Sequence, residues 1–120
     1  MEKNEVSPLD YYYEKQSETT KACLLALKAI ILSVDENIVH TRKYQIPFFR
    51  YKDFNLGFLW VHRKRIIVGF VEDKKTFSDG FSKHRKDNVV TLEVNPMEDI
   101  TMNIIHDKIK MLIDKYNIRQ

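Results

Sequence analysis

The sequence contains one cysteine, three glycines and three prolines among its 120 residues. The single cysteine, Cys23, cannot form a disulfide within the chain. Three glycines are too few for a glycine-rich phosphate-binding loop, and no nucleophile elbow or dinucleotide fingerprint is present. We therefore expect a protein that is not an enzyme and needs no disulfide to fold.

Long hydrophobic runs are also missing. The longest apolar-rich stretch, Ala22 to Val34, is interrupted by Lys28 and Ser33 and is too short to cross a bilayer. The first residues lack the apolar segment of a signal peptide. These features predict a cytosolic protein that makes no membrane contact.

No repeat, low-complexity tract or linker divides the chain. We expect one domain over residues 1–120, with a core from about 9 to 117 and a flexible segment at 1–6. The charge is uneven, because His40 to Lys86 holds twelve Lys and Arg against four acids, whereas the whole chain carries a net charge of +3. This asymmetry is a modest clue about the partners of the chain.

Two helices are predicted near the start of the chain and one near its end. Ser7 followed by Pro8 has the pattern of a helix start, and Ser17 is the expected N-cap of the next helix. Apolar residues at spacings of three and four continue that second helix to about Val34. The same period returns from about Thr101.

Between these helices the hydrophobic period changes to two, which is typical of strands. The expected strands are Ile38 to Gln45, Phe48 to Lys52, Leu56 to His62, Arg65 to Val71 and Val89 to Val94. Pro47 is interpreted as an interruption between the first two, since proline cannot donate to a sheet ladder. The predicted fold is α+β, with an antiparallel sheet of about five strands and the helices on one face.

The stretch from Tyr44 to Lys52 reads Tyr-Gln-Ile-Pro-Phe-Phe-Arg-Tyr-Lys. It resembles the Tyr-Gly-Met-Pro-x-Phe-x-Tyr-Lys segment of the YdhG-like domain family, a family largely of unknown function. Segments 23–27, 35–38, 69–72 and 94–100 resemble further family segments in the same order, so the resemblance covers roughly residues 9–116.

The resemblance implies an α+β fold and a bacterial cytosolic protein. Some family members are described as frataxin-like iron chaperones, which makes iron handling an alternative function. The sequence departs from the family pattern at His40, where Glu is frequent, and at Gln45 and Ile46, which replace Gly and Met. Any pocket that the family builds from these positions is altered here.

A ligand site is predicted at the first strands. Strand alternation places His40, Arg42 and Tyr44 on one face, where an imidazole, a guanidinium and a phenol could hold an anion or a polar ligand. Pro47 and Phe49 complete this candidate site. The alternative is the solvent face of an edge strand. The expected partner is a small ligand or a protein.

Two further kinds of site have weaker support. The basic residues Arg63, Lys64, Arg65, Lys83, Arg85 and Lys86 could contact nucleic acid. No nucleic-acid-binding signature accompanies them, so charged solvated turns are the favoured interpretation and nucleic acid is not the expected partner. Glu98, Asp99 and His106 are the best candidate metal ligands, but no metal-binding spacing is present and no cofactor is predicted.

The aromatic residues have two interpretations. Six of them could stack on bases or on a ring-bearing ligand, but packing between sheet and helices is more usual for such residues: Phe48, Phe49, Tyr51, Phe54, Phe58 and Trp60. Three consecutive tyrosines, residues 11–13, point in different directions on a helix, so at least one should lie near the surface. The chain is therefore expected to be a monomer or a homodimer.

Overall fold

The computed structural model describes residues 7–72 and 88–118. The elements are α1 (Pro8–Glu14), α2 (Glu18–Leu32), β1 (Ile38–Lys43), β2 (Ile46–Tyr51), β3 (Phe54–His62), β4 (Arg65–Glu72), β5 (Asn88–Val94) and α3 (Met102–Ile118). The five strands form one sheet in the order β1-β2-β3-β4-β5, with each neighbouring pair antiparallel. This confirms the predicted α+β class.

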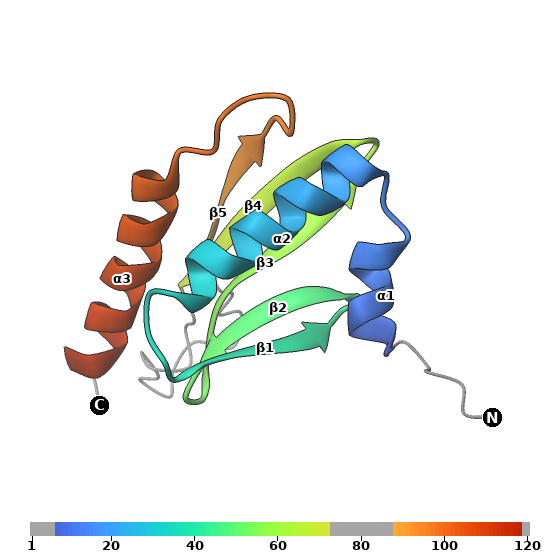
Figure 1. Cartoon of the computed structure of the whole chain (residues 1–120). Helices are drawn as coiled ribbons and strands as arrows, with labels where there is room; N and C mark the ends of the chain where they lie inside the picture. The colour runs from blue at the N-terminus through green and yellow to red at the C-terminus, as the bar shows by residue number, and fades with distance from the viewer. Residues whose placement is uncertain (1–6, 73–87, 119–120) are drawn as a thin grey trace.

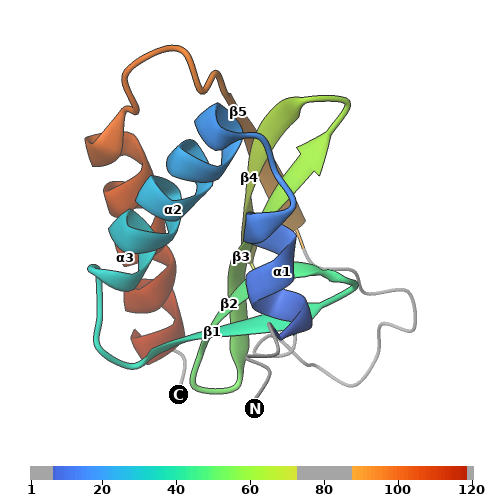
Figure 2. The same cartoon turned by 45° about the vertical axis from the view of Figure 1, so that its right-hand side comes forward.

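The helices lie on one face of this sheet. Figure 1 shows α2 crossing in front of β3 and β4, with α3 beside it and α1 near β1 and β2. The turned view of Figure 2 places α2 and α3 on the same side of β3 and β4. Among the described residues, no helix covers the opposite face, which we call the open face. No helix of this described part is long and apolar enough to cross a membrane.

The first two helices begin where the sequence predicts. Oγ of Ser7 accepts a hydrogen bond from the backbone N–H of Asp10 at 3.0 Å, and Pro8 follows at the first helical position. Oγ of Ser17 caps α2 in the same way through the N–H of Thr20. Each cap satisfies a backbone donor that the helix itself cannot, which fixes both starting points.

The first hairpin differs from the sequence prediction. Instead of one strand interrupted at Pro47, the chain reverses at Tyr44 and Gln45, and Pro47 lies inside β2, paired with Arg42. Tyr44 and Gln45 have φ angles of 53° and 66°. Two consecutive positive φ angles are typical of a tight hairpin turn, in which glycine and asparagine are favoured. Tyr44 and Gln45 are neither, so the sequence contains no signal for a turn at this point.

The central strand, β3, has an irregularity that redirects its side chains. The register with β2 shifts between Phe49 and Arg50, so that Phe49 pairs with Gly57 but Arg50 pairs with Asn55. Leu56, left between these pairs, is fully buried in the core together with Leu59. Leu56 and Phe58 therefore lie on opposite faces of the sheet, because a bulge changes the face on which the following residues lie.

Tyr116 ties the last helix to the middle of the sheet. Its side chain is fully buried and its ring stacks on Phe54 at 4.5 Å between centroids. Its hydroxyl donates to the carbonyl oxygens of Asn55 at 2.9 Å and Val71 at 2.8 Å. One phenol thus joins α3 to both β3 and β4.

Tyr116→Phe is expected to lower the free energy of unfolding by about 1–3 kcal/mol, because two buried carbonyls lose their hydroxyl donor. Urea denaturation with an unchanged m-value measures this. The matched control is Tyr51→Phe, which should cost about 1 kcal/mol or less, because the Tyr51 hydroxyl donates to the side chain of the exposed Asn117 at 3.0 Å. Equal losses in the two variants would contradict the proposed importance of Tyr116.

Candidate functional site

The predicted ligand residues separate onto the two faces of the sheet. His40 faces the helices, where its ring stacks on the fully buried Phe49 at 5.0 Å. Tyr44 leaves the strand at the turn, and its ring contacts Phe48 at 5.8 Å on the open face. The expectation that His40 and Tyr44 share a face is therefore wrong. The cause is the turn at Tyr44, since strand alternation ends at Lys43.

The other two predicted residues lie apart from any shared centre. Arg42 is exposed on β1 and Pro47 is buried in β2. The sequence-predicted site is therefore divided: His40 and Phe49 belong to a packed helix-side cluster, and Tyr44 belongs to an open-face region.

On the helix side, His40 holds α1 against the first hairpin. The hydroxyl of Tyr13 lies 2.7 Å from Nε2 of His40, and Nζ of Lys28 lies over the Tyr13 ring at 5.6 Å. Burial, together with the charge of Lys28, lowers the pKa of His40 to about 4. Burial likewise raises the pKa of Tyr13. A neutral imidazole accepting from a neutral phenol suits a structural contact.

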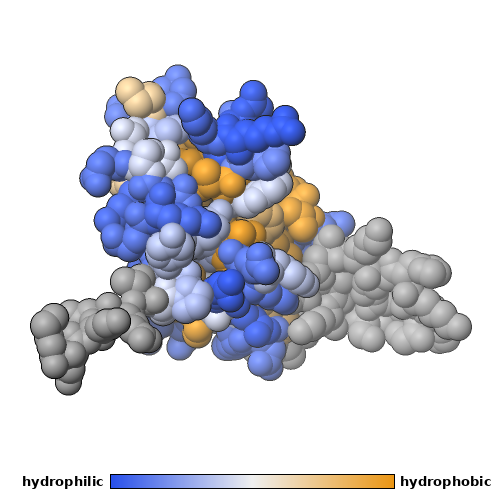
Figure 3. Space-filling model, turned by 90° about the vertical axis from the view of Figure 1, so that its right-hand side faces the viewer, coloured by the Kyte–Doolittle hydropathy of each residue, from blue (hydrophilic) through white to orange (hydrophobic). Residues whose placement is uncertain are grey.

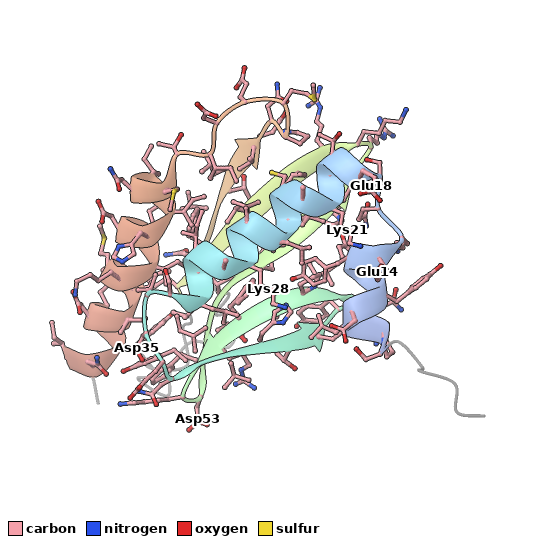
Figure 4. All side chains as sticks on the ribbon, viewed as in Figure 1. Glu14, Glu18, Lys21, Lys28, Asp35 and Asp53 are labelled. Atoms are coloured by element: carbon pink, nitrogen blue, oxygen red, sulfur yellow. The ribbon has the colours of Figure 1, made fainter. Side chains whose placement is uncertain are left out.

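The surroundings of this cluster are visible in Figure 4. Lys28 lies on the part of α2 that faces the first hairpin, whereas Glu14 and Lys21 lie at the corner between α1 and α2. Nζ of Lys21 and the carboxylate of Glu14 form a salt bridge at 3.0 Å. The hydroxyl of Tyr12 accepts a hydrogen bond from the backbone N–H of Val61 at 2.9 Å. Through these contacts α1 is fixed to α2, β1 and β3.

The open face contains a hollow with a volume of about 300 Å³. Its lining residues come from all five strands and from the first turn: Lys43, Tyr44, Ile46, Phe48, Asn55, Phe58, Trp60, Val71 and Val89. Four of these nine side chains are aromatic, and none is acidic. Such a composition suits a flat, apolar ring rather than a strongly hydrated ligand.

The aromatic side chains of the hollow contact one another in a row. The rings of Tyr44 and Phe48 lie 5.8 Å apart, and those of Phe48 and Phe58 lie 5.4 Å apart. Tyr44 is 77% exposed, whereas Phe48 is buried beneath it. Trp60 is 38% exposed and its ring lies 4.7 Å from that of His62. The hollow thus has a rigid aromatic base and accessible aromatic rims.

Glycine makes room for this arrangement. Gly69 of β4 pairs with Phe58, and a Cβ at Gly69 would lie 2.2 Å from atoms of the Phe58 ring. The ring therefore lies flat over the glycine, a cross-strand contact available only where no side chain intervenes. Sequence reasoning identified Phe58 and Trp60 but assigned them to packing, because the bulge in β3 leaves no mark in the sequence.

Basic side chains lie near the aromatic rings of the hollow. Nζ of Lys43 lies 5.4 Å from the Tyr44 ring centroid and 5.7 Å from that of Phe48, within the range of cation–π contacts. Arg63 and Lys64 form the turn between β3 and β4, next to His62. Arg65 is paired with Glu93 at 3.6 Å. The remaining basic candidates, Lys83, Arg85 and Lys86, lie outside the described residues.

The other candidate residues do not gather in the same way. Glu98 and Asp99 line a separate surface hollow beside α2. Within α3, Nδ1 of His106 lies 3.5 Å from Oδ1 of Asp107. Within residues 7–72 and 88–118, no group of three or more His, Cys, Asp or Glu side chains could hold a metal ion. Burial raises the pKa of the Cys23 thiol, which favours the unreactive neutral form.

The surface also exposes apolar side chains elsewhere. Viewed from the side of α1, hydrophobic residues form a band between hydrophilic regions (Figure 3). The open-face hollow differs from such scattered apolar surface, because its rings come from neighbouring strands and contact each other. We therefore take the hollow as the candidate functional site.

Comparison of the chain with protein-family models, curated proteins and solved structures finds no match, and the resemblance to the YdhG-like family therefore stays a prediction.

Proposed function

We propose that the protein is a cytosolic, non-catalytic binding domain that takes a ligand with a flat ring in the aromatic hollow of the open face. The observation that carries this proposal is the position of Tyr44. Its backbone is left-handed, with φ 53°, and its ring remains 77% exposed above Phe48. A large aromatic residue at such a position costs backbone strain and gains little burial.

Glycine or asparagine at the same turn would relieve that strain. Fold stability alone therefore does not account for Tyr44. A role in contacting a ligand does, since an exposed ring at the edge of an aromatic hollow can close over a bound ring by stacking. Strained residues of this kind are concentrated at functional sites.

The walls of the hollow support the same function. Phe48 and Phe58 are held by packing across β2, β3 and β4, so a ligand would meet rings that are already ordered. Little side-chain entropy is then lost on binding. Because Lys43 is the only charged residue among the nine that line the hollow, a neutral ring can enter without meeting an unpaired carboxylate.

Trp60 makes the proposal directly testable, since it is the one tryptophan of the sequence and it lines the hollow. In ¹⁵N-labelled protein, its single indole N–H signal should shift when a neutral planar compound such as adenosine is titrated. The variant Tyr44→Asn with Gln45→Gly should weaken that binding by roughly tenfold, the loss of about one aromatic contact. The same change should raise the free energy of unfolding by about 1 kcal/mol, since the turn strain is removed.

The matched control is Tyr11→Ala, which removes an exposed tyrosine of α1 that does not line the hollow. It should leave the titration unchanged. If no neutral planar compound in a broad panel shifts the Trp60 signal, the proposed function is wrong. Binding that survives the Tyr44 change in full would also contradict the site.

A further inference from the structure

Positive charge lies next to the aromatic hollow at Lys43, which lines it, and at the β3–β4 turn, which follows the strand that contains Trp60. Lys43 precedes the β1–β2 turn, and Arg63 with Lys64 forms the β3–β4 turn. The strand register places these two turns at the same end of the sheet. β2 and β3 are antiparallel, and Phe48 near the start of β2 pairs with Phe58 near the end of β3. The turn before β2 and the turn after β3 therefore lie at the same end. Trp60 and its neighbour His62 lie on the strand that leads to the second turn.

Among the described residues, the strands around the hollow carry few acidic side chains. None of the nine residues that line the hollow is acidic, and Glu93 of β5 is paired with Arg65. Over residues 40–72 the sequence has seven Lys and Arg against two acids, Asp53 and Glu72. Glu72 accepts from Lys115 at 2.7 Å, and Asp53 lies in the turn between β2 and β3 (Figure 4). Among the described residues, the strands at the aromatic end of the open face therefore carry more positive than negative charge.

We infer that the ring bound in the hollow is a nucleobase and that the cations of the two turns contact phosphate, so that the ligand is a nucleotide unit. This inference rests on the proposed function. Aromatic side chains that stack on bases, beside lysine and arginine that contact phosphates, are the usual means of binding unpaired nucleic acid. Strand pairing places both at one end of the sheet, a juxtaposition that the basic runs alone did not show.

The separation of the cations favours a strand over a single nucleotide. Lys43 belongs to one hairpin and Arg63 with Lys64 to another, so both points are used together only by a ligand with more than one phosphate. An unpaired strand supplies repeated phosphates and bases whose faces are free to stack. A duplex does not, since its bases are stacked on each other. A free nucleotide has the same chemistry and is distinguished by experiment.

The test compares adenosine, adenosine monophosphate and a fluorescein-labelled single strand of about ten nucleotides. The single strand should bind most tightly, measured by fluorescence anisotropy and by the shift of the Trp60 indole signal. Raising the salt from 50 to 200 mM should weaken its binding by roughly tenfold, the loss expected for two or three phosphate contacts. A duplex of the same sequence should bind more weakly than the strand.

The variant Arg63→Asn with Lys64→Gly removes two charges while supplying residues that suit the left-handed turn. It should weaken strand binding by roughly tenfold at low salt and reduce the salt dependence. It should leave adenosine binding unchanged. The control Lys110→Gln removes a cation from the exposed side of α3 and should not affect the strand.

The outcomes separate this inference from the function on which it rests. If adenosine shifts the Trp60 signal but the strand binds no better, or binds without salt dependence, the nucleotide assignment is wrong and the ring-binding function stands. If the monophosphate binds as tightly as the strand, a free nucleotide is the ligand. If neither adenosine nor the strand shifts the Trp60 signal, both proposals are wrong. Equal binding of strand and duplex would also overturn the inference.

Discussion

Gly57→Ala is expected to lower the free energy of unfolding by about 3 kcal/mol or more. A Cβ at this position would lie 2.3 Å from the backbone carbonyl oxygen of Gly69 on the adjacent strand. Because backbone atoms cannot rotate away, β3 and β4 would have to separate at the centre of the sheet. Urea denaturation monitored by circular dichroism measures the loss, and failure to obtain folded protein is the extreme of the same result.

Gly69→Ala provides the matched comparison. Here the added Cβ meets the ring of Phe58 at 2.2 Å, and a half-buried ring on the open face can move. We expect a loss of about 1–2 kcal/mol, and Phe58→Leu in the same chain should recover part of it. A Gly57→Ala protein as stable as Gly69→Ala would show that the two strands are not held at this distance. Adenosine binding should weaken in Gly69→Ala, since the displaced ring alters the hollow.

Acidification from pH 6.5 to 4 is expected to reduce the free energy of unfolding by about 2–3 kcal/mol through His40 alone. The pKa of His40 is lowered from 6.5 to about 4 in the folded protein, because burial and Lys28 disfavour the charged ring. Between these two pH values the unfolded chain binds the proton and the folded chain does not. The contribution is therefore complete above pH 6.5 and is lost as the pH falls toward 4.

His40→Gln isolates this effect, since a side-chain amide can accept from Tyr13 but does not titrate. The variant should be less stable near neutral pH, but its stability should fall less steeply between pH 6.5 and 5, above the range in which most carboxylates titrate. His106→Gln, which changes a residue outside this cluster, should retain the wild-type slope. Equal slopes in wild type and His40→Gln would contradict the assignment.

Much of the fold could be predicted because its signals are local. Ser7 and Ser17 cap their helices by contacts within three residues, and hydrophobic periods mark α2 and α3. The predicted strand Leu56 to His62 corresponds to β3, the middle strand of the sheet. These signals depend only on neighbouring residues, so they are readable without knowledge of tertiary contacts.

The candidate site could not be predicted, because it depends on backbone conformations for which the residue types give no signal. Tyr44 and Gln45 adopt left-handed angles without glycine or asparagine, and the bulge at Leu56 moves Phe58 to the open face. The assignment of His40 and Tyr44 to one face failed for this reason. Tertiary pairing selects these conformations against local preference.

The order of the strands has a consequence for synthesis of the chain. Each strand pairs only with its neighbours in sequence, so the sheet has largely local topology and can form rapidly as the chain emerges. Its helix-facing side, which includes Leu59, Ile66 and Val68, stays incompletely covered until α3 docks through Tyr116 near the C-terminal end of the sequence. Docking of α3, rather than sheet formation, is then the step that shields this nascent apolar surface from chaperones and from other chains.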